Sequence, residues 1–474
     1  MKSPIDSLES LKGLKVTVMG LGLNGGGLAS VSFLARHGAE VTATDMRDEK
    51  VLAPTLEALK GLPVRYVLGR HEMGDFEDAD LVIKNPAVKP DSPYLKAAPA
   101  VETDISLFLR LTKAPILAVT GSKGKSTAST ALHHCLVSAG RKALLGGNIT
   151  VSPLSFFAQT GPDTPVVLEL SSWQLADMKG LGVLRPRVAL LTSMMPDHMN
   201  RYSSMEEYMA DKRLIYADQD ASSWTVANAD DGWNRSFASE SRASIGWYSD
   251  EASAVARAGG GEASPRAWLE SATRRGLYAQ TQGGQVEEIL PSSLLVPGRH
   301  QRKNLLGAAL ALRLFGLEAE EIARGMASFR GVEHRLEFFA EKEGVRWYND
   351  SAATIPQAVA AALESFEEPM VLITGGTDKN LDFSPVASSY ALARDIILLG
   401  GSGTDKLIPL LQAQGKAYQG PFADFGAALA AARKAASPGD VVLLSPGCTS
   451  FGMFLHEFDR GLKFKEGVRA MLGL

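Results

Sequence analysis

The sequence predicts an α/β protein built from three domains, each with a largely parallel sheet. Its 474 residues correspond to about three domains of ordinary size. Short apolar segments alternate along the chain with helical ones, which is the pattern of strands buried on both faces by helices. Glycine-rich turns follow two of these strands, at Gly20–Gly25 and Gly121–Gly124. The expected domains cover residues 1–112, 113–332 and 333–474.

The composition excludes several classes of protein. With 45% hydrophobic and 22% charged residues, the chain resembles globular proteins and is not disordered. A net charge of −4 leaves no basic excess for nucleic acid or anionic lipid. No run of about 18 apolar residues predicts a membrane span, and the first residues lack the apolar core of a signal peptide. The two cysteines, Cys135 and Cys448, are too few for a disulfide framework, so we expect a cytoplasmic protein.

The first domain is expected to be Rossmann-like. Its strand, glycine-rich turn, helix and second strand are predicted at Leu14–Met19, Gly20–Gly25, Ala29–His37 and Glu40–Thr44. The glycines let the backbone approach an anion, and the start of the helix favours negative charge. Asp45 ends the second strand, where an acidic residue would contact a ribose. The pattern fits a nucleotide or diphosphate ligand, NAD included, and a purely structural turn remains the alternative.

The second domain is expected to be of the P-loop ATPase type, with a mainly parallel sheet. The strand Ile116–Thr120 runs into Gly-Ser-Lys-Gly-Lys-Ser-Thr at residues 121–127, which opens a helix. Loop N–H groups and Lys125 would hold phosphates, and a hydroxyl of Ser126 or Thr127 would reach Mg²⁺. The common pattern has an earlier glycine where this chain has Val119. Two phosphate-binding turns in successive domains predict an enzyme that uses ATP on a second phosphate-bearing substrate.

Other polar residues follow predicted strands and gain interest from that position. Glu169 ends the strand beginning at Val166, where a carboxylate can hold Mg²⁺, and His198 follows the strand Val188–Thr192. Lys212 lies on a predicted helix, and a helical lysine is ordinarily a solvated surface charge. Asp350, Lys379 and Ser450 also look unremarkable one by one. Their places at the carboxyl ends of strands are nevertheless where open α/β sheets bind ligands.

The later part of the chain continues the alternation. Short β-prone segments between Ser222 and Pro297 predict a partly antiparallel extension, and a helix over Gln301–Leu314 closes it. The third domain is expected to be Rossmann-like. Its strands are predicted at Val345–Tyr348, Met370–Thr374, Ile396–Leu399 and Val441–Leu444, and its helices include Ile355–Glu364 and Phe425–Ala436.

Taken together, the motifs resemble those of the Mur ligases of peptidoglycan synthesis, over essentially the whole chain. The family's loop variant T-G-x-x-G-K-[ST] is met by Thr120–Ser126, which accounts for the missing first glycine. Its E-x-S-S-[FW]-Q segment is met by Glu169–Gln174, and its D-H-x-x-R/W-Y turn by Asp197–Tyr202. The remaining matches are Lys212, His300–Asn304, His334-Arg335, Asn349–Thr354, Gly375–Lys379, Asp382–Ser384, Ser445–Phe451 and Asp459–Gly461.

The resemblance implies an ATP-dependent ligase of peptidoglycan synthesis. It would join D-glutamate to UDP-N-acetylmuramoyl-L-alanine through an acyl phosphate, with two Mg²⁺ ions as cofactors. A related Mur-type or folylpolyglutamate-type ligase that adds another amino acid, such as L-glutamate, is the alternative. Under this resemblance, the first glycine-rich motif is expected to bind uridine diphosphate and not NAD. The resemblance implies a monomer, while the composition predicts a cytoplasmic location and no nucleic-acid or membrane partner.

The resemblance also implies roles for individual residues. UDP would be bound by Leu21, Gly22, Leu23, Asn24, Gly25, Asp45, Met46 and Arg47. ATP would be bound by Gly121, Ser122, Lys123, Gly124, Lys125, Ser126, Thr127, Gln301, Asn304, Arg335 and Asp350. The amino acid would be bound by Thr354, Lys379, Ser450 and Phe458. The catalytic residues would be Lys125, Glu169, His198 and Lys212, and the metal ligands Ser126, Glu169, His198 and Lys212.

Three features bear on the finer chemistry. In the family, the lysine matching Lys212 is carbamylated by CO₂, which turns a cation that repels Mg²⁺ into an anion that binds it. Ala352 stands where many members have lysine, and the aromatic residue near the C-terminus is shifted by one, which leaves Glu457 and Phe458 as alternatives for the glutamate site. The choice between D- and L-glutamate therefore stays open at this point.

Overall fold

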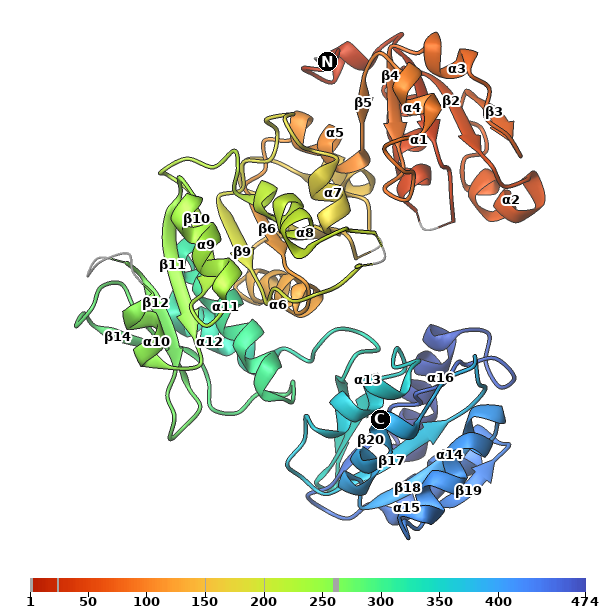
Figure 1. Ribbon diagram of the computed structural model, residues 1–474, viewed down its shortest axis with the longest axis vertical. Coiled ribbons are helices and arrows are strands. Elements are labelled where there is room, and N and C mark those ends of the chain that lie inside the picture. Colours follow the sequence, from red (N-terminus) through yellow and green to blue (C-terminus); the bar gives the residue numbers. More distant parts are fainter. Residues whose placement is uncertain (1–2, 24, 150, 200, 259–263) are drawn as a thin grey trace. The chain divides into compact units, whose positions relative to one another are not determined.

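The computed structural model describes residues 3–23, 25–149, 151–199, 201–258 and 264–474. The chain forms two compact units (Figure 1), one made of Met1–Ser292 with Asn304–Met326 and one of Ser293–Lys303 with Ala327–Leu474. Three mostly parallel sheets confirm the predicted α/β class. The domain boundaries at residues 112 and 332 stay predictions. Within the described ranges, no helix has the length and apolar character needed to cross a membrane.

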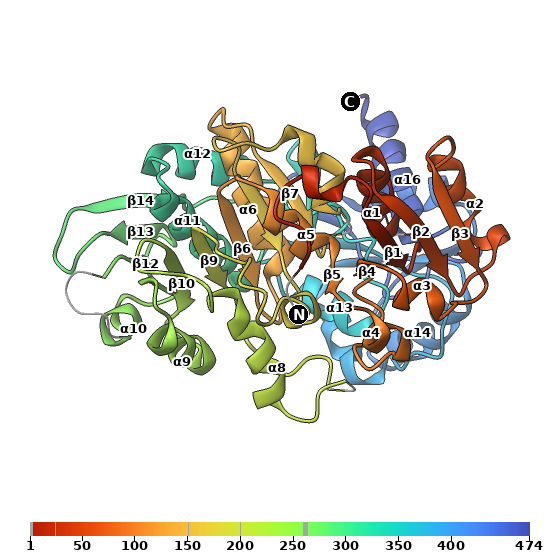
Figure 2. The ribbon, with the colours of Figure 1, turned by 90° about the horizontal axis from the view of Figure 1, so that it is seen from above.

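The first unit begins with a parallel sheet in the order β3-β2-β1-β4-β5. Its strands are β1 (Lys15–Met19), β2 (Glu40–Asp45), β3 (Val64–Leu68), β4 (Leu81–Lys84) and β5 (Val101–Glu102). Its helices are η1 (Glu9–Leu11), α1 (Gly26–Arg36), α2 (Glu49–Ala58), α3 (Gly74–Glu77), α4 (Pro93–Ala97) and α5 (Asp104–Leu111). Helix α1 packs on β1 and β2 (Figure 2). Strand β1 lies between β2 and β4, so the strand order reverses direction at β1. In such sheets, ligands bind at the carboxyl ends of the strands where the order reverses.

The second sheet of this unit has the order β14-β13-β12-β11-β10-β9-β6-β8-β7. Its strands are β6 (Ile116–Thr120), β7 (Leu144–Gly147), β8 (Val166–Glu169), β9 (Val188–Leu191), β10 (Trp224–Asn228), β11 (Ser244–Ser249), β12 (Arg266–Leu269), β13 (Gly276–Ala279) and β14 (Val286–Leu290). Only β13 and β14 run antiparallel to their neighbours, whereas β10, β11 and β12 continue the parallel sheet. The antiparallel extension predicted from Ser222 onward is therefore shorter than expected.

Helices cover this second sheet. They are α6 (Lys125–Ser138), η2 (Pro153–Gln159), α7 (Ser172–Ala176), α8 (Met205–Lys212), η3 (Arg213–Ile215), α9 (Gly232–Glu240), α10 (Ala252–Arg257), α11 (Arg299–Phe315) and α12 (Ala319–Ser328). One continuous apolar core joins the two sheets, because it contains residues of α1 and α5 as well as of η2, β6 and β8. The first unit is therefore a single body in which both phosphate-binding turns are held.

The second unit is built on a sheet in the order β15-β16-β20-β17-β18-β19. Its strands are β15 (Glu337–Lys342), β16 (Val345–Asn349), β17 (Met370–Gly375), β18 (Asp395–Leu399), β19 (Gln419–Phe422) and β20 (Val441–Leu444). Its helices are α13 (Pro356–Leu363), η4 (Ser384–Leu392), α14 (Ser402–Ala413), α15 (Phe425–Ala435) and α16 (Glu457–Leu472). Only β15 is antiparallel to its neighbour.

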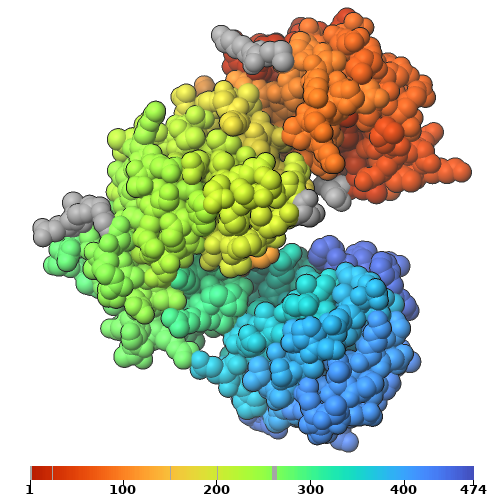
Figure 3. Space-filling view, in the orientation of Figure 1, coloured from red at the N-terminus to blue at the C-terminus, as the bar shows by residue number. Residues whose placement is uncertain are grey.

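Both faces of this sheet are buried. Tyr348 and Leu372 belong to one apolar cluster, and their strand neighbours Trp347 and Ile373 belong to another. Successive residues of a strand point to opposite faces, so helices must cover the sheet on both sides. The atoms of this unit are coloured from teal to blue in the space-filling view of Figure 3.

Candidate active site

The phosphate loop follows β6 and is held by the end of the neighbouring strand β9. Gly121 has φ of 152°, and a Cβ added to it would lie 1.9 Å from Oγ1 of Thr192. That hydroxyl lies 2.7 Å from the carbonyl oxygen of Lys123 and 3.1 Å from that of Thr120. No side chain larger than glycine fits at position 121. Thr192, which the sequence motifs did not single out, thus shapes the loop.

The second loop glycine meets helix α11. Gly124 caps α6 with φ of 90°, and a Cβ there would lie 2.4 Å from Oδ1 of Asn304. Asn304 was predicted to contact ATP, and the structure places it directly against the phosphate loop. Helix α6 begins at Lys125, two residues earlier than predicted, so Lys125 and Ser126 belong to its first turn.

Two lysines converge on one carbonyl of this loop. Nζ of Lys125 donates to the carbonyl oxygens of Gly121 and Ser122 at 3.0 and 3.1 Å. Nζ of Lys212, the last residue of α8, donates to the same Gly121 oxygen at 2.8 Å. The Lys212 side chain is buried, and its Nζ lies 4.6 Å from the ring centre of Tyr208. Burial, with the charge of Lys125, lowers the pKa of Lys212 to about 7.

A buried carboxylate stands beside the loop. Glu169 ends β8 and pairs with Val119 of the neighbouring strand β6. Its Oε1 accepts a hydrogen bond from Nδ2 of Asn148 at 2.8 Å, and its Oε2 accepts a longer one from Oγ of Ser129 at 3.4 Å. Asn148 was not predicted, although its place directly after β7 is the signal that could have identified it. The carboxylate is thus oriented at the carboxyl edge of the sheet, next to the phosphate loop.

His198 lies at the same edge but is more exposed. It has φ of 55°, and its ring centre lies 5.5 Å from that of Trp173 and 6.4 Å from that of Tyr208. Its neighbour Asp197 forms an ion pair with Lys123 at 3.0 Å. Burial opposes the effect, but Lys123 outweighs it and lowers the pKa of Asp197. Across the described ranges, no group of three or more His, Cys, Asp or Glu side chains could by itself hold a metal ion, so the proposed ligand set stays a prediction.

The glycine-rich turn of the first sheet is braced by Asp45. Its Oδ2 accepts a hydrogen bond from the backbone N–H of Gly22, and its Oδ1 one from that of Arg47, both at 2.9 Å. Nδ2 of Asn85, after β4, donates to the carbonyl of Gly20 at 3.4 Å. Both carboxylate oxygens of Asp45 thus support the turn itself.

The other residues predicted to bind UDP differ in their exposure. The Leu21 side chain is fully buried in the core, so only its backbone can face a ligand. Leu23 is half exposed and Met46 is 63% exposed. Gly25 has φ of 87° and caps α1. Asn24 lies outside the described residues.

In the second unit, Asp350 follows β16 and is buried. Its Oδ2 accepts a hydrogen bond from Oγ of Ser445 at 2.7 Å, and its Oδ1 one from the backbone N–H of Leu336 at 3.2 Å. Burial raises the pKa of Asp350 to about 7, against the opposing effects of these bonds and of Arg335 and Arg460. The carboxyl group therefore keeps its proton to a higher pH than an ordinary aspartate.

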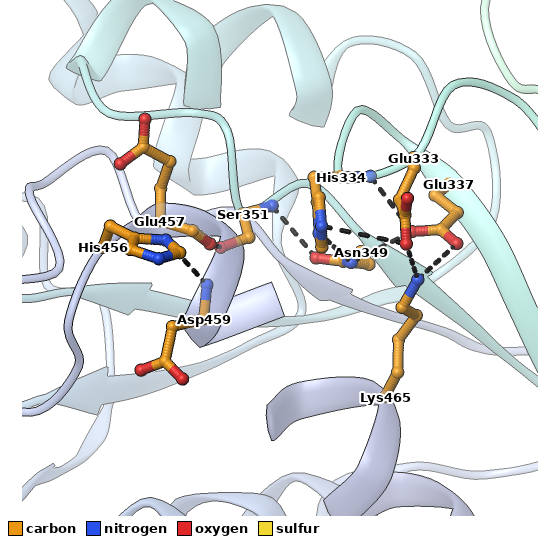
Figure 4. A network of polar contacts seen from close by, with 9 residues as sticks. All are labelled: Glu333, His334, Glu337, Asn349, Ser351, His456, Glu457, Asp459 and Lys465. Carbon is orange, nitrogen blue, oxygen red and sulfur yellow. Dashed lines mark hydrogen bonds and ion pairs between the residues drawn. The ribbon is translucent and has the colours of Figure 1, made fainter. Parts of the chain in front are cut away.

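Arg335, a predicted phosphate ligand, lies in a backbone segment held by a polar network (Figure 4). Its neighbour His334 has φ of 63°. Oε2 of Glu337 accepts hydrogen bonds from the backbone N–H of His334 and from Nδ2 of Asn349, both at 3.0 Å. Nζ of Lys465, on α16, lies 3.0 Å from Oε1 of Glu337. These contacts fix the backbone beside Arg335.

The segments predicted to bind the amino acid meet at one edge of the sheet. The backbone N–H of Thr449 donates to the carbonyl of Thr377 at 3.0 Å, which brings the turn that carries Lys379 next to the segment that carries Ser450. Ser450 is buried and Lys379 is exposed.

The remaining residues predicted to bind ATP or the amino acid lie on different elements. Thr354 is half buried, two residues before α13, and Gln301 lies in the first turns of α11. The Phe458 ring lies 5.3 Å from that of His334, whereas the backbone carbonyl of Glu457 accepts from the Ser351 hydroxyl. The aromatic residue thus packs on the network beside Arg335.

Three family descriptions match successive parts of the chain. Residues 14–106 match the Mur ligase MurD-like, N-terminal domain, residues 119–312 the Mur ligase middle domain, and residues 334–448 the Mur ligase, glutamate ligase domain. Together these matches span all three sheets.

Individual proteins are similar over the whole length. A UDP-N-acetylmuramoylalanine–D-glutamate ligase of Treponema pallidum (strain Nichols) is 43% identical, over 97% of this chain and 98% of its own. A protein of the same name from Roseiflexus sp. (strain RS-1) is 40% identical, over 97% and 99%. The crystal structure of the UDP-N-acetylmuramate-alanine ligase MurC of Thermotoga maritima shares the fold, with a TM-score of 0.56 at 21% identity over 96% of this chain and 100% of that one. The chain belongs to the Mur ligase family.

Proposed function

We propose that this chain is an ATP-dependent ligase of peptidoglycan synthesis that joins D-glutamate to UDP-N-acetylmuramoyl-L-alanine. The observation that carries the proposal is the convergence of Lys125 and Lys212 on the carbonyl of Gly121, beside the buried carboxylate of Glu169. These residues lie in a chain with full-length similarity to relatives named as that ligase.

The reaction needs ATP because a carboxylate is a poor electrophile. A carboxylate oxygen of the alanine residue attacks the γ-phosphorus, the bond to the bridging oxygen breaks, and ADP leaves. The amine nitrogen of D-glutamate then attacks the acyl carbon, phosphate leaves with the electrons of the C–O bond, and the nitrogen loses a proton. Two anions meet in the first step, so positive charge must offset their repulsion. Lys125 supplies part of this charge from the first turn of α6.

The residues at the loop fit a bound Mg²⁺. This ion typically takes one or two carboxylates and completes its octahedron with phosphate oxygens and water. Glu169, buried and oriented by Asn148, is such a carboxylate, and the hydroxyl of Ser126 is a second oxygen donor in the first turn of α6. When bound, Mg²⁺ supplies the charge that lets the γ-phosphate and the substrate carboxylate approach each other. His198 is assigned to the same metal-binding edge.

Lys212 is proposed to act as a carbamate. Its neutral amine would attack the carbon of CO₂, form an N–C bond and lose a proton, which gives an anion. An ordinary lysine with a pKa of 10.5 is almost fully protonated at pH 7, whereas burial and Lys125 bring the pKa of Lys212 to about 7. A large fraction of the amine is therefore in the reactive form. The carbamate would pair with Lys125 and offer oxygens to Mg²⁺.

The other roles follow the positions of the residues. The turn Gly20–Gly25 and the segment Asp45–Arg47 are assigned to the diphosphate and the uracil. ATP is assigned to the phosphate loop and to Gln301, Asn304, Arg335 and Asp350, and the amino acid to Thr354, Lys379, Ser450 and Phe458. We also propose a cytoplasmic monomer, in line with two buried free cysteines that suit a reducing compartment.

Phosphate release tests the proposal directly. The enzyme is incubated with ATP, Mg²⁺, UDP-N-acetylmuramoyl-L-alanine and one amino acid at a time, with D-glutamate, L-glutamate and alanine as the panel. We expect continuous release with D-glutamate alone. Release with L-glutamate and none with D-glutamate would favour the related ligase instead. No release with any amino acid would refute the ligase assignment.

A further inference from the structure

A buried ion pair joins the two sheets of the first unit. Lys84 is the last residue of β4 in the first sheet, and Asp177 directly follows α7 at the second. Nζ of Lys84 donates to both carboxylate oxygens of Asp177 at 2.7 Å. Only 4% and 9% of the two side chains are exposed. Burying such a pair costs desolvation energy that its mutual attraction only partly offsets, so stability alone is a weak reason for it.

The neighbouring contacts between the two sheets are apolar. Phe33 on α1 lies 5.1 Å from Phe157 on η2, and Phe108 on α5 lies 6.0 Å from both Phe156 and Phe157, measured between ring centres. Apolar burial is non-directional and tolerates small sliding movements. A lysine that bonds both oxygens of one carboxylate has a defined geometry. The ion pair is therefore a directional contact between the two sheets.

Each partner is close to a segment with a proposed function. The residue after Lys84 is Asn85, whose backbone N–H donates to the carbonyl of Met19 at 2.9 Å and whose side chain donates to that of Gly20. Asp177 caps the short helix that starts three residues after Glu169. Trp173 of this helix lies 5.5 Å from the ring of His198. The pair thus ties the glycine-rich turn of the first sheet to the metal-binding edge of the second.

We propose that Lys84 and Asp177 are positioning residues that fix the uridine-diphosphate turn relative to the phosphate loop, so that the substrate carboxylate reaches the γ-phosphate. This inference rests on the proposed function, because it takes the first turn as the anchor of the UDP end. Both side chains are buried and bonded to each other, so neither is available to substrate. A misplacement of about 1 Å can cost a reaction about a hundredfold in rate.

The test replaces the pair by apolar residues in Lys84→Met/Asp177→Leu. Such replacements often leave stability unchanged or raise it, so the variant is expected to fold. We expect the Kd values for UDP and for a non-hydrolysable ATP analogue to stay within about twofold of the parent's, while kcat for phosphate release falls by about tenfold to a hundredfold. The matched control is Lys60→Met/Glu57→Leu, which removes an exposed ion pair at the end of α2 in the same unit and should leave kcat unchanged.

A kcat within about twofold of the parent's in the Lys84/Asp177 variant would overturn the proposal. A fall in kcat that is matched by weaker UDP or ATP-analogue binding would also overturn it, because the pair would then serve binding and not placement. If the double variant does not fold, Asp177→Glu keeps the charge but displaces the contact, and an unchanged kcat there would be equally decisive. A parent enzyme without D-glutamate-dependent phosphate release would instead refute the proposed function, which is measured first.

Discussion

Replacing Asp350 with asparagine should stabilise the protein at pH 8 and change its stability little at pH 4. Burial raises the pKa of this carboxyl from its ordinary 3.8 to about 7. Between these values the folded protein keeps a proton that the unfolded chain has released. The free energy of unfolding therefore falls by about 1.4 kcal/mol for each unit that the pH rises. Above pH 7 the buried carboxylate therefore lowers the free energy of unfolding by about 4 kcal/mol. Asparagine carries no charge, so the variant does not pay this cost.

The hydrogen bonds of Asp350 can survive the substitution. The Asn Oδ1 would still accept from the backbone N–H of Leu336, and the amide Nδ2 would donate to the Ser445 hydroxyl, which at present donates to Oδ2. Each heavy atom keeps a partner, but the Ser445 O–H gives up its present acceptor, and this reduces the gain. The positive charges of Arg335 and Arg460 favour the native carboxylate, and this reduces the gain but does not reverse its sign.

Urea unfolding of parent and variant at about pH 4.5, 6 and 8, without nucleotide, measures the effect. The difference in unfolding free energy should grow with pH and reach at least about 1.5 kcal/mol at pH 8. Asp440→Asn is the control: Asp440 is equally buried but forms an ion pair with Arg394 at 2.8 Å, so its loss should destabilise the protein at pH 8. Parallel stability curves for parent and Asp350→Asn would refute the reasoning.

Two further predictions concern the phosphate loop. Lys212→Ala should lose most of its activity, and short carboxylic acids such as acetate should restore part of it, since they can replace the proposed carbamate; phosphate release with and without the acid measures this. Gly124→Ala should raise the KM for ATP by about tenfold or more, because the new Cβ would lie 2.4 Å from Oδ1 of Asn304 at a φ of 90°. Steady-state kinetics with varied ATP measures that change.

Each of these predictions has its own control. Full activity of Lys212→Ala would remove the basis for the carbamate, and an inactive variant that no acid restores would point to a structural role. Gly140→Ala matches Gly124→Ala, because Gly140 also has positive φ, at 76°, but an added Cβ would meet nothing within 4 Å. It should cost stability through the backbone alone and leave the KM for ATP unchanged. An equal rise in KM in both variants would contradict the role of the Asn304 contact.

The sequence was informative at two strands that end beside an acidic residue. Glu169 and Asp350 were predicted from their places after apolar segments, and both stand at carboxyl edges of parallel strands. The departure at Val119 also has a structural reason. Val119 is a buried residue of β6, paired with β8 and β9, so the phosphate loop begins only at Gly121. The phosphate loop of this chain is therefore shorter than the loop of the common pattern, which begins at an earlier glycine.

Contacts between distant segments could not be predicted in this way. Lys84 and Asp177 are 93 residues apart, and Lys465 and Glu337 are 128 apart. No local spacing encodes such a pairing, because it depends on how whole elements pack. The edge strand β19 (Gln419–Phe422) was missed for a different reason: most of it is exposed and it contains Gly-Pro, so it lacks the apolar pattern of a buried strand.

Lys212 has one feature that the local sequence could have predicted and one that it could not. Its residue type predicts a solvated charge, yet Tyr208 precedes it by four residues on α8, and both are buried. Residues four apart share one face of a helix, so the pattern could have shown that Lys212 faces inward. It could not have shown that Lys125 comes to the same carbonyl. Since burial and that second charge together lower the pKa of the amine to about 7, the reactivity proposed for Lys212 arises from the packed fold and not from its motif.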